Sequence, residues 1–306
     1  MNSYDAIILG AGPAGLTAAL YLARFGAKFA LVEKMTPGGL LLQIFEIENY
    51  PGLIMPKGYE LADAMEEQLK EFTFDRYQTC VTALEHKDGK VTLQAGEEAL
   101  ETKTLIICAG LHYNKLGLPD EDRFTGRGVS YCALCDANFF KGRVVGLAGN
   151  GNQALEEAVH LAALVRELRL FMRTAAPQAD RVLQKKLLAL KNVVIHKEVA
   201  ITALHGESEL EAVSIRSLQS GETEKFAMSG LFVIEGMRPV SEFFPRELVL
   251  DADGFIVTDT EMRTNLPGVF AAGDIRSKLC RQIVTAAGDG ATAANAAYSY
   301  LELADA

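Results

Sequence analysis

The sequence has 306 residues, of which 49% are hydrophobic and 23% charged; this is the composition of a folded globular protein of about two domains. Its formal net charge of −10 argues against a nucleic-acid-binding function, because phosphate binding needs clustered Lys and Arg. The most apolar early stretch, residues 7–22, is interrupted by three glycines and a proline and is shorter than the roughly 20 residues of a membrane helix. No secretory signal pattern is present at the beginning. We therefore expect a cytoplasmic protein that binds neither membranes nor nucleic acid.

The first segment has the pattern strand, glycine turn, helix, strand. Residues 6–9 are a short apolar run, residues 10–15 contain three glycines, and residues 16–25 are rich in Ala and Leu. Gly26 is placed to end the helix, and residues 29–33 form the next apolar run. This order predicts a βαβ unit.

The turn has the spacing Gly10-x-Gly12-x-x-Gly15, and Glu33 stands at the end of the second strand. In this context the spacing is a dinucleotide fingerprint. Gly10 permits the tight turn, and Gly12 lets backbone amides approach a pyrophosphate at the helix N-terminus. Glu33 would accept hydrogen bonds from ribose hydroxyls. The alternative is a tight turn that binds no ligand. The turn residues expected to contact the cofactor are Gly10, Gly12, Pro13, Ala14 and Gly15.

Three β patterns follow, at residues 81–84, 91–93 and 105–108. They predict a small antiparallel piece that completes the first domain.

The central chemical feature is the run Cys132-Ala133-Leu134-Cys135-Asp136. Two cysteines at this spacing can close a small disulfide, and a helix N-terminus lowers the pKa of a thiol. The adjoining Asp136 could donate or accept the proton that thiol–disulfide exchange requires. A zinc site would need a second pair of ligands, and none follows. We expect no metal site.

The other three cysteines, Cys80, Cys108 and Cys280, stand apart from one another. A secreted disulfide framework is therefore not expected. We expect all three to be buried small apolar residues.

A second βαβ pattern begins at residue 143. Residues 143–148 form a strand, the turn contains Gly149, Gly151 and Ala154, and a helix over 155–165 leads to a strand at 168–172. Two copies about 140 residues apart indicate two dinucleotide-fold domains.

The last segment is again strand, turn and helix, with the strand at 268–274 and the helix at about 285–301. The sequence therefore predicts an α/β fold with two Rossmann-like dinucleotide-binding domains, the second inserted into the first. We expect the first domain to comprise residues 1–113 and 244–306, and the second, with the cysteine pair, residues 114–243.

Taken together, these motifs resemble those of the low-molecular-weight thioredoxin reductases, in the family's order and over nearly the whole chain. The matching stretches are residues 10–15 with Glu33, 37–39, 48–52, 128–136, 149–154 with 156–158, 268–274, 281–282 and 285–288. The resemblance implies the FAD/NAD(P)-linked disulfide reductase fold, with FAD as cofactor. It also implies reduction of a thioredoxin-like protein, and a homodimer.

The resemblance further implies a role for individual residues. Cys135 would exchange electrons with the flavin, Cys132 would attack the partner's disulfide, and Asp136 would be the acid. Around the cofactor, Gly38, Gly39 and Asn49 would lie near the flavin, Gly273 and Asp274 would hold the ribityl–pyrophosphate region, and Arg281 and Gln282 would approach the isoalloxazine edge.

The second nucleotide site departs from the family pattern. NADPH-dependent members have a cluster of the form H-R-R-x-x-x-R after the second βαβ unit, whereas residues 172–178 read Met-Arg-Thr-Ala-Ala-Pro-Gln. Only Arg173 remains to pair with a 2′-phosphate, so NADPH should bind poorly. The turn residues Gly149, Gly151 and Ala154 could still hold a pyridine nucleotide. NADH, or a ferredoxin that reduces the flavin directly, is therefore favoured over NADPH as electron donor.

Two other functions remain open. The same residues could form a dithiol oxidase that runs in reverse and passes electrons through FAD to oxygen, because sequence does not fix redox potentials. The chain could also be a flavin electron-transfer module with incidental cysteines, although the C-x-x-C motif argues against this function.

Overall fold

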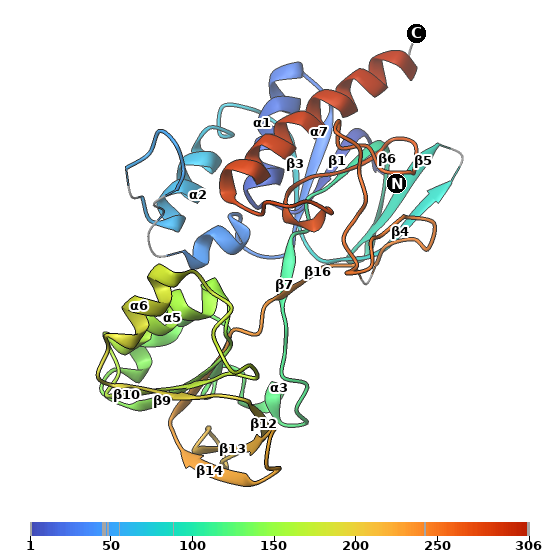
Figure 1. Cartoon of the computed structure of the whole chain (residues 1–306). Helices are drawn as coiled ribbons and strands as arrows, with labels where there is room; N and C mark the ends of the chain where they lie inside the picture. The colour runs from blue at the N-terminus through green and yellow to red at the C-terminus, as the bar shows by residue number, and fades with distance from the viewer. Residues whose placement is uncertain are drawn as a thin grey trace. The chain divides into compact units, whose positions relative to one another are not determined.

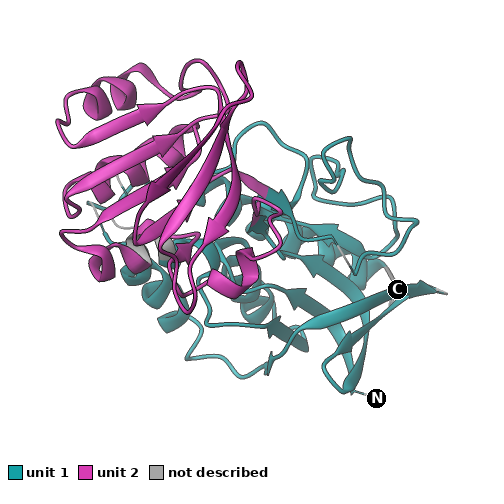
Figure 2. Cartoon of the chain, turned by 90° about the horizontal axis from the view of Figure 1, so that it is seen from below, with its two compact units in different colours: residues 1–112, 238–306 teal, residues 113–237 magenta. Residues whose placement is uncertain are grey.

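The structure, a computed structural model, describes the backbone of residues 2–44, 47, 49–54, 56–87, 89–241 and 243–304, and the side chains of all of these except Gln43, Leu134, Cys135 and Ala304. The chain forms two compact units (Figure 2). Unit 1 is Met1–His112 with Arg238–Ala306, and unit 2 is Tyr113–Met237. Unit 2 is thus an insertion between the two parts of unit 1. From the sequence, we predicted domain boundaries at 113/114 and 243/244. The cofactor that each domain binds stays a prediction.

Unit 1 is built on a seven-stranded sheet in the order β3-β2-β1-β6-β5-β4, with β17 also paired to β6 (Figure 1). The parallel strands are β1 (Asn2–Leu9), β2 (Phe29–Glu33), β3 (Asp75–Gln78), β6 (Glu98–Ile107) and β17 (Val269–Ala271). The antiparallel strands are β4 (Val81–Lys87) and β5 (Lys90–Ala95), which extend the sheet from β6.

The expectation of a separate antiparallel piece that includes residues 105–108 is wrong in one respect. Residues 105–107 lie in the last part of β6, which pairs in parallel with both β1 and β17. Only the first part of β6 pairs with β5. A ten-residue strand is long enough to have different neighbours on the same edge, and a short apolar pattern does not reveal its full length.

Two helices, α1 (Pro13–Phe25) and α7 (Ile283–Ala304), lie side by side on one face of this sheet (Figure 1). Small residues permit the close contact: a Cβ at Gly290 would lie 2.1 Å from the carbonyl oxygen of Ala14. Gly26 ends α1 in the left-handed conformation with φ 74°. The shorter helices of the unit are η1 (Gly39–Gln43), α2 (Gly58–Glu67) and η3 (Gly273–Ile275).

Unit 2 contains a five-stranded parallel sheet in the order β11-β10-β9-β15-β8. These strands are β8 (Val129–Ser130), β9 (Val144–Ala148), β10 (Glu167–Phe171), β11 (Val193–His196) and β15 (Gly230–Val233). The helices are α3 (Glu121–Phe124), α4 (Ala133–Asp136), η2 (Ala137–Phe140), α5 (Asn152–Ala162) and α6 (Arg181–Leu188).

A second, antiparallel sheet in unit 2 is formed by β12 (Val199–His205), β13 (Ala212–Ser217) and β14 (Thr223–Ala227). Near the joints, β7 (Leu111–Tyr113) and β16 (Met237–Pro239) form a two-stranded sheet. The predicted α/β fold with two Rossmann-like units, one inserted into the other, is confirmed. Within the described ranges, no helix has both the length and the apolar character needed to cross a membrane.

Candidate functional site

The first glycine turn connects β1 to α1 in unit 1. Gly10 has φ 103°, and a Cβ there would lie 2.3 Å from the carbonyl oxygen of Cys108, so the fold requires glycine. A Cβ at Gly15 would lie 1.8 Å from the carbonyl oxygen of Gly10. Gly12 is different, because its φ is an ordinary −74° and no heavy atom lies within 4 Å of an added Cβ. The space beside Gly12 is therefore open to a ligand that approaches the uncapped amides of α1.

Two neighbouring segments are held by hydrogen bonds to the backbone of Ala11 in this turn. The carboxylate of Glu33 accepts the N–H of Ala11 at Oε2 and that of Met35 at Oε1, each at 2.8 Å. The N–H of Gly38 donates to the carbonyl of Ala11 at 2.7 Å. Gly38 and Gly39 have φ of 122° and 56°, and Gly39 lies against the glycine turn. The predicted residues Glu33, Gly38 and Gly39 are thus brought together at the start of α1.

The segment Gly273–Asp274 reaches the same place from the C-terminal part of the chain. Gly273 has φ 82°, and a Cβ there would lie 2.9 Å from the Cβ of Ala14 in α1. Asp274 Oδ1 is buried without a hydrogen-bond partner and lies 3.4 Å from Nζ of Lys278. Burial raises the pKa of the Asp274 carboxyl, against an opposing effect of the Lys278 charge. A buried oxygen with free acceptor capacity is suited to a hydroxyl-bearing ligand.

Sequence reasoning missed a buried ionic cluster behind this segment. Asp289 of α7 accepts hydrogen bonds from Arg276 Nη1 at 2.9 Å, from Lys278 Nζ at 2.9 Å and from the N–H of Gly273 at 3.2 Å. The side chains of Lys278 and Asp289 are 9% and 12% exposed. The cluster anchors Gly273 and Lys278, which lie next to Asp274. A signal was present, because Asp289 is a single charge in a helical stretch of small residues.

Three more predicted cofactor residues gather in unit 1. Asn49 Nδ2 donates to Gln282 Oε1 at 3.0 Å, although the two are far apart in sequence. Arg281 Nε donates to the carbonyl oxygen of Asp274 at 3.3 Å. The guanidinium of Arg281 also stacks on the ring of Phe255, with 3.8 Å to the ring centroid. Glu48, in the stretch that resembles the family, lies outside the described residues.

The redox turn belongs to unit 2 and joins β8 to α4. Cys132 is disulfide-bonded and 9% exposed. The predicted partner is Cys135, whose side chain lies outside the described residues, so the pairing stays a prediction. The Cys132 backbone is held by Ser130, whose hydroxyl accepts the Cys132 N–H at 3.1 Å and donates to the Cys132 carbonyl at 3.2 Å. Asp136 N–H donates to the same carbonyl at 3.3 Å, so the predicted acid is one helical turn from Cys132.

The second glycine turn, between β9 and α5, repeats the features of the first. Gly149 has φ 148°, and a Cβ there would lie 2.3 Å from the carbonyl oxygen of Ile234. At Gly151, φ is −85° and an added Cβ meets nothing within 4 Å. Ala154 is buried in the third position. The middle glycine is again unobstructed, next to a helix N-terminus without a side-chain cap.

The loop after β10 lies beside this second turn, and its one positive charge is paired with a carboxylate. Arg173 Nε lies 3.8 Å from Oε1 of Glu235, a residue that sequence reasoning missed. Burial raises the pKa of the Glu235 carboxyl, against an opposing effect of Arg173. Asn150 Nδ2 donates to Thr174 Oγ1 at 2.9 Å, and the N–H of Gln178 donates to the Asn150 carbonyl at 2.8 Å. The loop is therefore bound to the glycine turn through neutral groups, and its one arginine faces a carboxylate.

The remaining cysteines only partly match the expectation. Cys108 is buried, and burial raises the pKa of its thiol. Cys80 and Cys280 are exposed, so the expectation of three buried cysteines is wrong for these two. Cys80 follows the edge strand β3 and Cys280 precedes the start of α7; a Cys in such a connection is not enclosed by the core. All three are free thiols.

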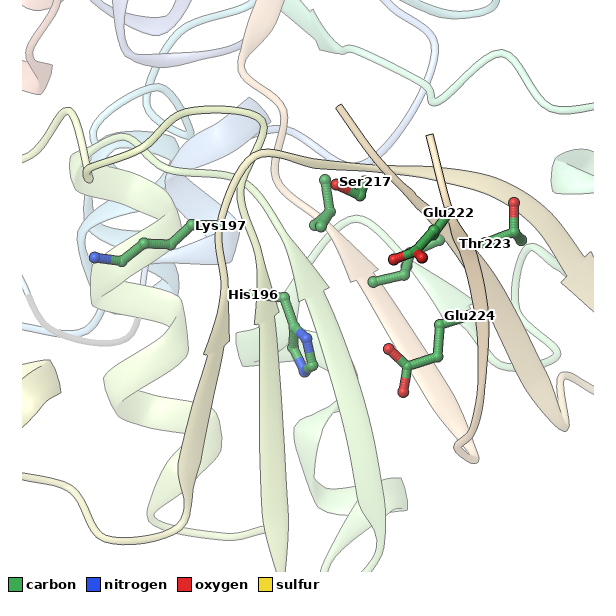
Figure 3. A pocket seen from close by; sticks show the side chains of 8 residues that line it. His196, Lys197, Ser217, Glu222, Thr223 and Glu224 are labelled. Atoms are coloured by element: carbon green, nitrogen blue, oxygen red, sulfur yellow. The ribbon is translucent and has the colours of Figure 1, made fainter. Parts of the chain in front are cut away.

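A pocket of about 560 Å³ lies elsewhere in unit 2, between the end of β11 and the β13–β14 hairpin. Figure 3 shows that the side chains of His196, Glu222 and Glu224 line it. Burial and the charge of Arg169 lower the pKa of His196. Lys197 also lines the pocket, but none of the predicted site residues does.

Comparison with known proteins agrees with the fold of two Rossmann-like units. Residues 4–290 match the pyridine nucleotide-disulphide oxidoreductase family. The chain is 36% identical to the thioredoxin reductase of Treponema pallidum over 302 residues, which cover 98% of each chain. It is similar to the crystal structure of thioredoxin reductase from Lactococcus lactis, with TM-score 0.91, 36% identity and coverage of 98% of this chain and 99% of that one.

A further solved structure is that of a ferredoxin-flavin thioredoxin reductase from Clostridium acetobutylicum. Its TM-score is 0.57 at 27% identity, with coverage of 100% of this chain and 99% of that one. The chain is thus a member of the pyridine nucleotide-disulphide oxidoreductases. Within this class, it belongs to the bacterial-type, low-molecular-weight thioredoxin reductase family. It is an FAD-dependent protein-disulfide oxidoreductase, of a family whose members use FAD and a nicotinamide cofactor.

Proposed function

We propose that the protein passes electrons through FAD to a Cys132/Cys135 dithiol and on to a thioredoxin-like protein, with a donor other than NADPH. The observation that carries the donor assignment is the ion pair between Arg173 and Glu235, 3.8 Å apart, in the second nucleotide site. We further propose a cytoplasmic homodimer, as the resemblance to the family implies.

The residues of unit 1 fit FAD. The open space beside Gly12 would admit the pyrophosphate to the first amides of α1. Glu33 would hold the ribose, and Oδ1 of Asp274, which has no hydrogen-bond partner, would accept a hydrogen bond from a hydroxyl of the ribityl chain. Arg281, Gln282 and Asn49 would border the flavin ring. When bound, FAD supplies two-electron transfer between a donor and a disulfide.

The redox turn would perform the exchange. Reduction of a Cys132–Cys135 disulfide takes up two electrons and two protons and gives two thiols. The Cys132 thiolate then attacks one sulfur of the partner's disulfide, and the partner's second sulfur leaves as a thiolate. Asp136, one turn away from Cys132, would carry the proton to or from these sulfurs. Attack by Cys135 on the mixed disulfide releases the reduced partner.

The charge of the second site supports a donor without a 2′-phosphate. That phosphate brings about two negative charges, which arginine pairs usually neutralise. Here Arg173 is offset by Glu235, and the other two positions of the family cluster are Thr174 and Gln178. Asp180 adds a carboxylate near α5, because its Oδ2 accepts a hydrogen bond from Asn152. NADH lacks the phosphate. A ferredoxin would not use the site, and the similarity to a ferredoxin-flavin thioredoxin reductase supports that donor as well.

Anaerobic titration of the purified flavoprotein with NADPH, NADH and reduced ferredoxin tests the proposal. We expect NADH or ferredoxin, but not micromolar NADPH, to bleach the flavin absorbance. A variant with Thr174→Arg, Gln178→Arg and Glu235→Gln should gain reduction by NADPH, and Glu235→Gln alone should gain less. Rapid bleaching of the parent by micromolar NADPH would refute the donor assignment.

A separate variant tests the electron path. Cys135→Ser should leave flavin reduction intact and abolish transfer to thioredoxin. Continued turnover in this variant would show that the assigned dithiol is wrong. Reduction of oxygen coupled to oxidation of a dithiol, at a rate above that of thioredoxin reduction, would indicate the oxidase instead.

A further inference from the structure

A carboxylate of α5 lies directly beside the redox turn. Glu157 Oε2 accepts the N–H of Ala133, the residue after Cys132, at 2.8 Å. Its Oε1 accepts a hydrogen bond from Gln153 Nε2 at 2.9 Å. Burial raises the pKa of the Glu157 carboxyl, and these two hydrogen bonds oppose that effect. The same helix begins at the second glycine turn, so one element borders both the nucleotide turn and the redox turn.

The polar surroundings continue beyond Glu157. The side chain of Gln153 also lies near the hydroxyl of Tyr113, the first residue of unit 2. The ring of Tyr113 stacks on that of Tyr131, which precedes Cys132, with 6.2 Å between centroids. Together with the two bonds of Ser130 to the Cys132 backbone, this fixes the redox turn from both sides. A buried network with satisfied partners holds its members in one geometry.

The position of Glu157 has an electrostatic consequence for Cys132. A cysteine thiolate is stabilised when neighbouring N–H groups donate to it and when positive charge is near. The Ala133 amide, the first donor after Cys132, is already bonded to a carboxylate. Among the described residues, the ionisable groups that act on this carboxylate or lie one turn along α5 are Glu156, the Tyr113 hydroxyl and His160, and Asp136 lies on α4 itself. Burial lowers the pKa of His160 and so favours its neutral form, and the others are not cations, so no charge in this set compensates Glu157.

We propose that Glu157 is a positioning residue for the dithiol: it occupies the Ala133 amide and places negative charge beside Cys132, which makes the reduced pair a stronger reductant. The proposal rests on the proposed role of Cys132 in attacking the partner's disulfide. In the exchange, the enzyme dithiol and the partner's disulfide are converted to the enzyme disulfide and the partner's dithiol. A less stable enzyme thiolate shifts this equilibrium toward reduction of the partner. The electrons come from the FAD-dependent reaction that the family performs.

The test uses the flavin-loaded protein and three variants. Glu157→Gln keeps the shape and an acceptor for Ala133 but removes the charge. Glu157→Asp keeps the charge on a shorter side chain. Glu156→Gln removes an exposed charge one residue away and serves as the matched control. The reduced protein is alkylated with iodoacetamide as a function of pH, and fragment-ion mass spectrometry assigns the modification to Cys132, because Cys135 lies on the same peptide and Cys80 and Cys280 also react.

In Glu157→Gln we expect the pKa of the Cys132 thiol to fall by about one unit. At a pH above the thiol pKa of both proteins, equilibration with reduced and oxidised glutathione should shift about tenfold toward the enzyme dithiol. Glu156→Gln and Glu157→Asp should match the parent in both measurements. An unchanged thiol pKa and equilibrium in Glu157→Gln, whatever the change in thermal stability, would overturn the proposal. Neither measurement uses an electron donor or thioredoxin, so failure here is distinct from failure of Cys135→Ser to block transfer.

Discussion

Gly12→Ala and Gly15→Ala form a matched pair that separates what the fold needs from what the cofactor needs. A Cβ at Gly15 would lie 1.8 Å from the carbonyl oxygen of Gly10, so strand and helix would have to separate by roughly 1.2 Å to reach the shortest Cβ contact found in proteins. Overpacking of this kind costs about 3 kcal/mol or more when backbone must move. At Gly12 the φ is ordinary and an added Cβ contacts nothing within 4 Å. The cost there should stay below about 1 kcal/mol.

The assay compares the apoprotein and its affinity for FAD. Urea denaturation of the flavin-free variants should show a large loss of stability for Gly15→Ala and almost none for Gly12→Ala. Titration with FAD, followed by quenching of flavin fluorescence, should show that Gly12→Ala binds at least about tenfold more weakly, equivalent to about 1.4 kcal/mol. If Gly12→Ala bound FAD as tightly as the parent, the space beside Gly12 would not be the pyrophosphate site. If its apoprotein were as unstable as Gly15→Ala, the fold itself would require this glycine.

Three further predictions concern buried and exposed groups. Asp289→Asn should lower the free energy of unfolding by about 3–5 kcal/mol in chemical denaturation, because it leaves Arg276 and Lys278 buried without a full counter-charge; a loss below about 1 kcal/mol would contradict this. In the native oxidised protein, a thiol reagent such as DTNB should modify Cys80 and Cys280 and leave Cys108 intact until unfolding, which peptide mapping can check. The pKa of Asp274 is raised in the fold, so its contribution to stability is present below the ordinary carboxyl pKa and is lost as pH rises through the folded value. The apoprotein of Asp274→Asn should therefore gain stability relative to the parent from pH 4 toward neutrality, and a constant difference across that range would contradict the assignment.

The sequence predicted the elements whose signals are local. These are the glycine turns, Gly26 at the end of α1, and the strands predicted at 29–33 and 143–148, the second of which begins at Val144 in the structure. Each depends on residues within one βαβ unit. The α/β class followed from two such units. The start of β6 was predicted poorly, because only residues 105–107 form an apolar run, whereas residues 98–104 include two glutamates, a lysine and two threonines.

The polar partners of the site could not be predicted in the same way. Glu157 bonds to Ala133 across 24 residues, and Asn49 bonds to Gln282 across 233. Glu235 reaches Arg173 from the turn after β15. Each of these pairs depends on how two elements pack, and no spacing in the sequence encodes it. The sequence thus indicated the cysteines and glycines of the candidate site. The structure was needed to find the carboxylates that lie beside them.

The two glycine turns together suggest how to separate the two remaining donors. In both turns the first glycine, Gly10 or Gly149, has a positive φ that the fold requires. The second glycine, Gly12 or Gly151, has an ordinary φ and free space beside it. Gly151→Ala should therefore be almost neutral for the apoprotein, and any effect reports on a ligand at the N-terminus of α5. If NADH is the donor, its pyrophosphate approaches these amides and Gly151→Ala should raise the KM for NADH about tenfold or more. If ferredoxin is the donor, Gly151→Ala should leave turnover with reduced ferredoxin unchanged. Equal loss of turnover with both donors would contradict the assignment of Gly151 to a nucleotide site, because it would mean that the substitution disturbs the fold or the redox turn.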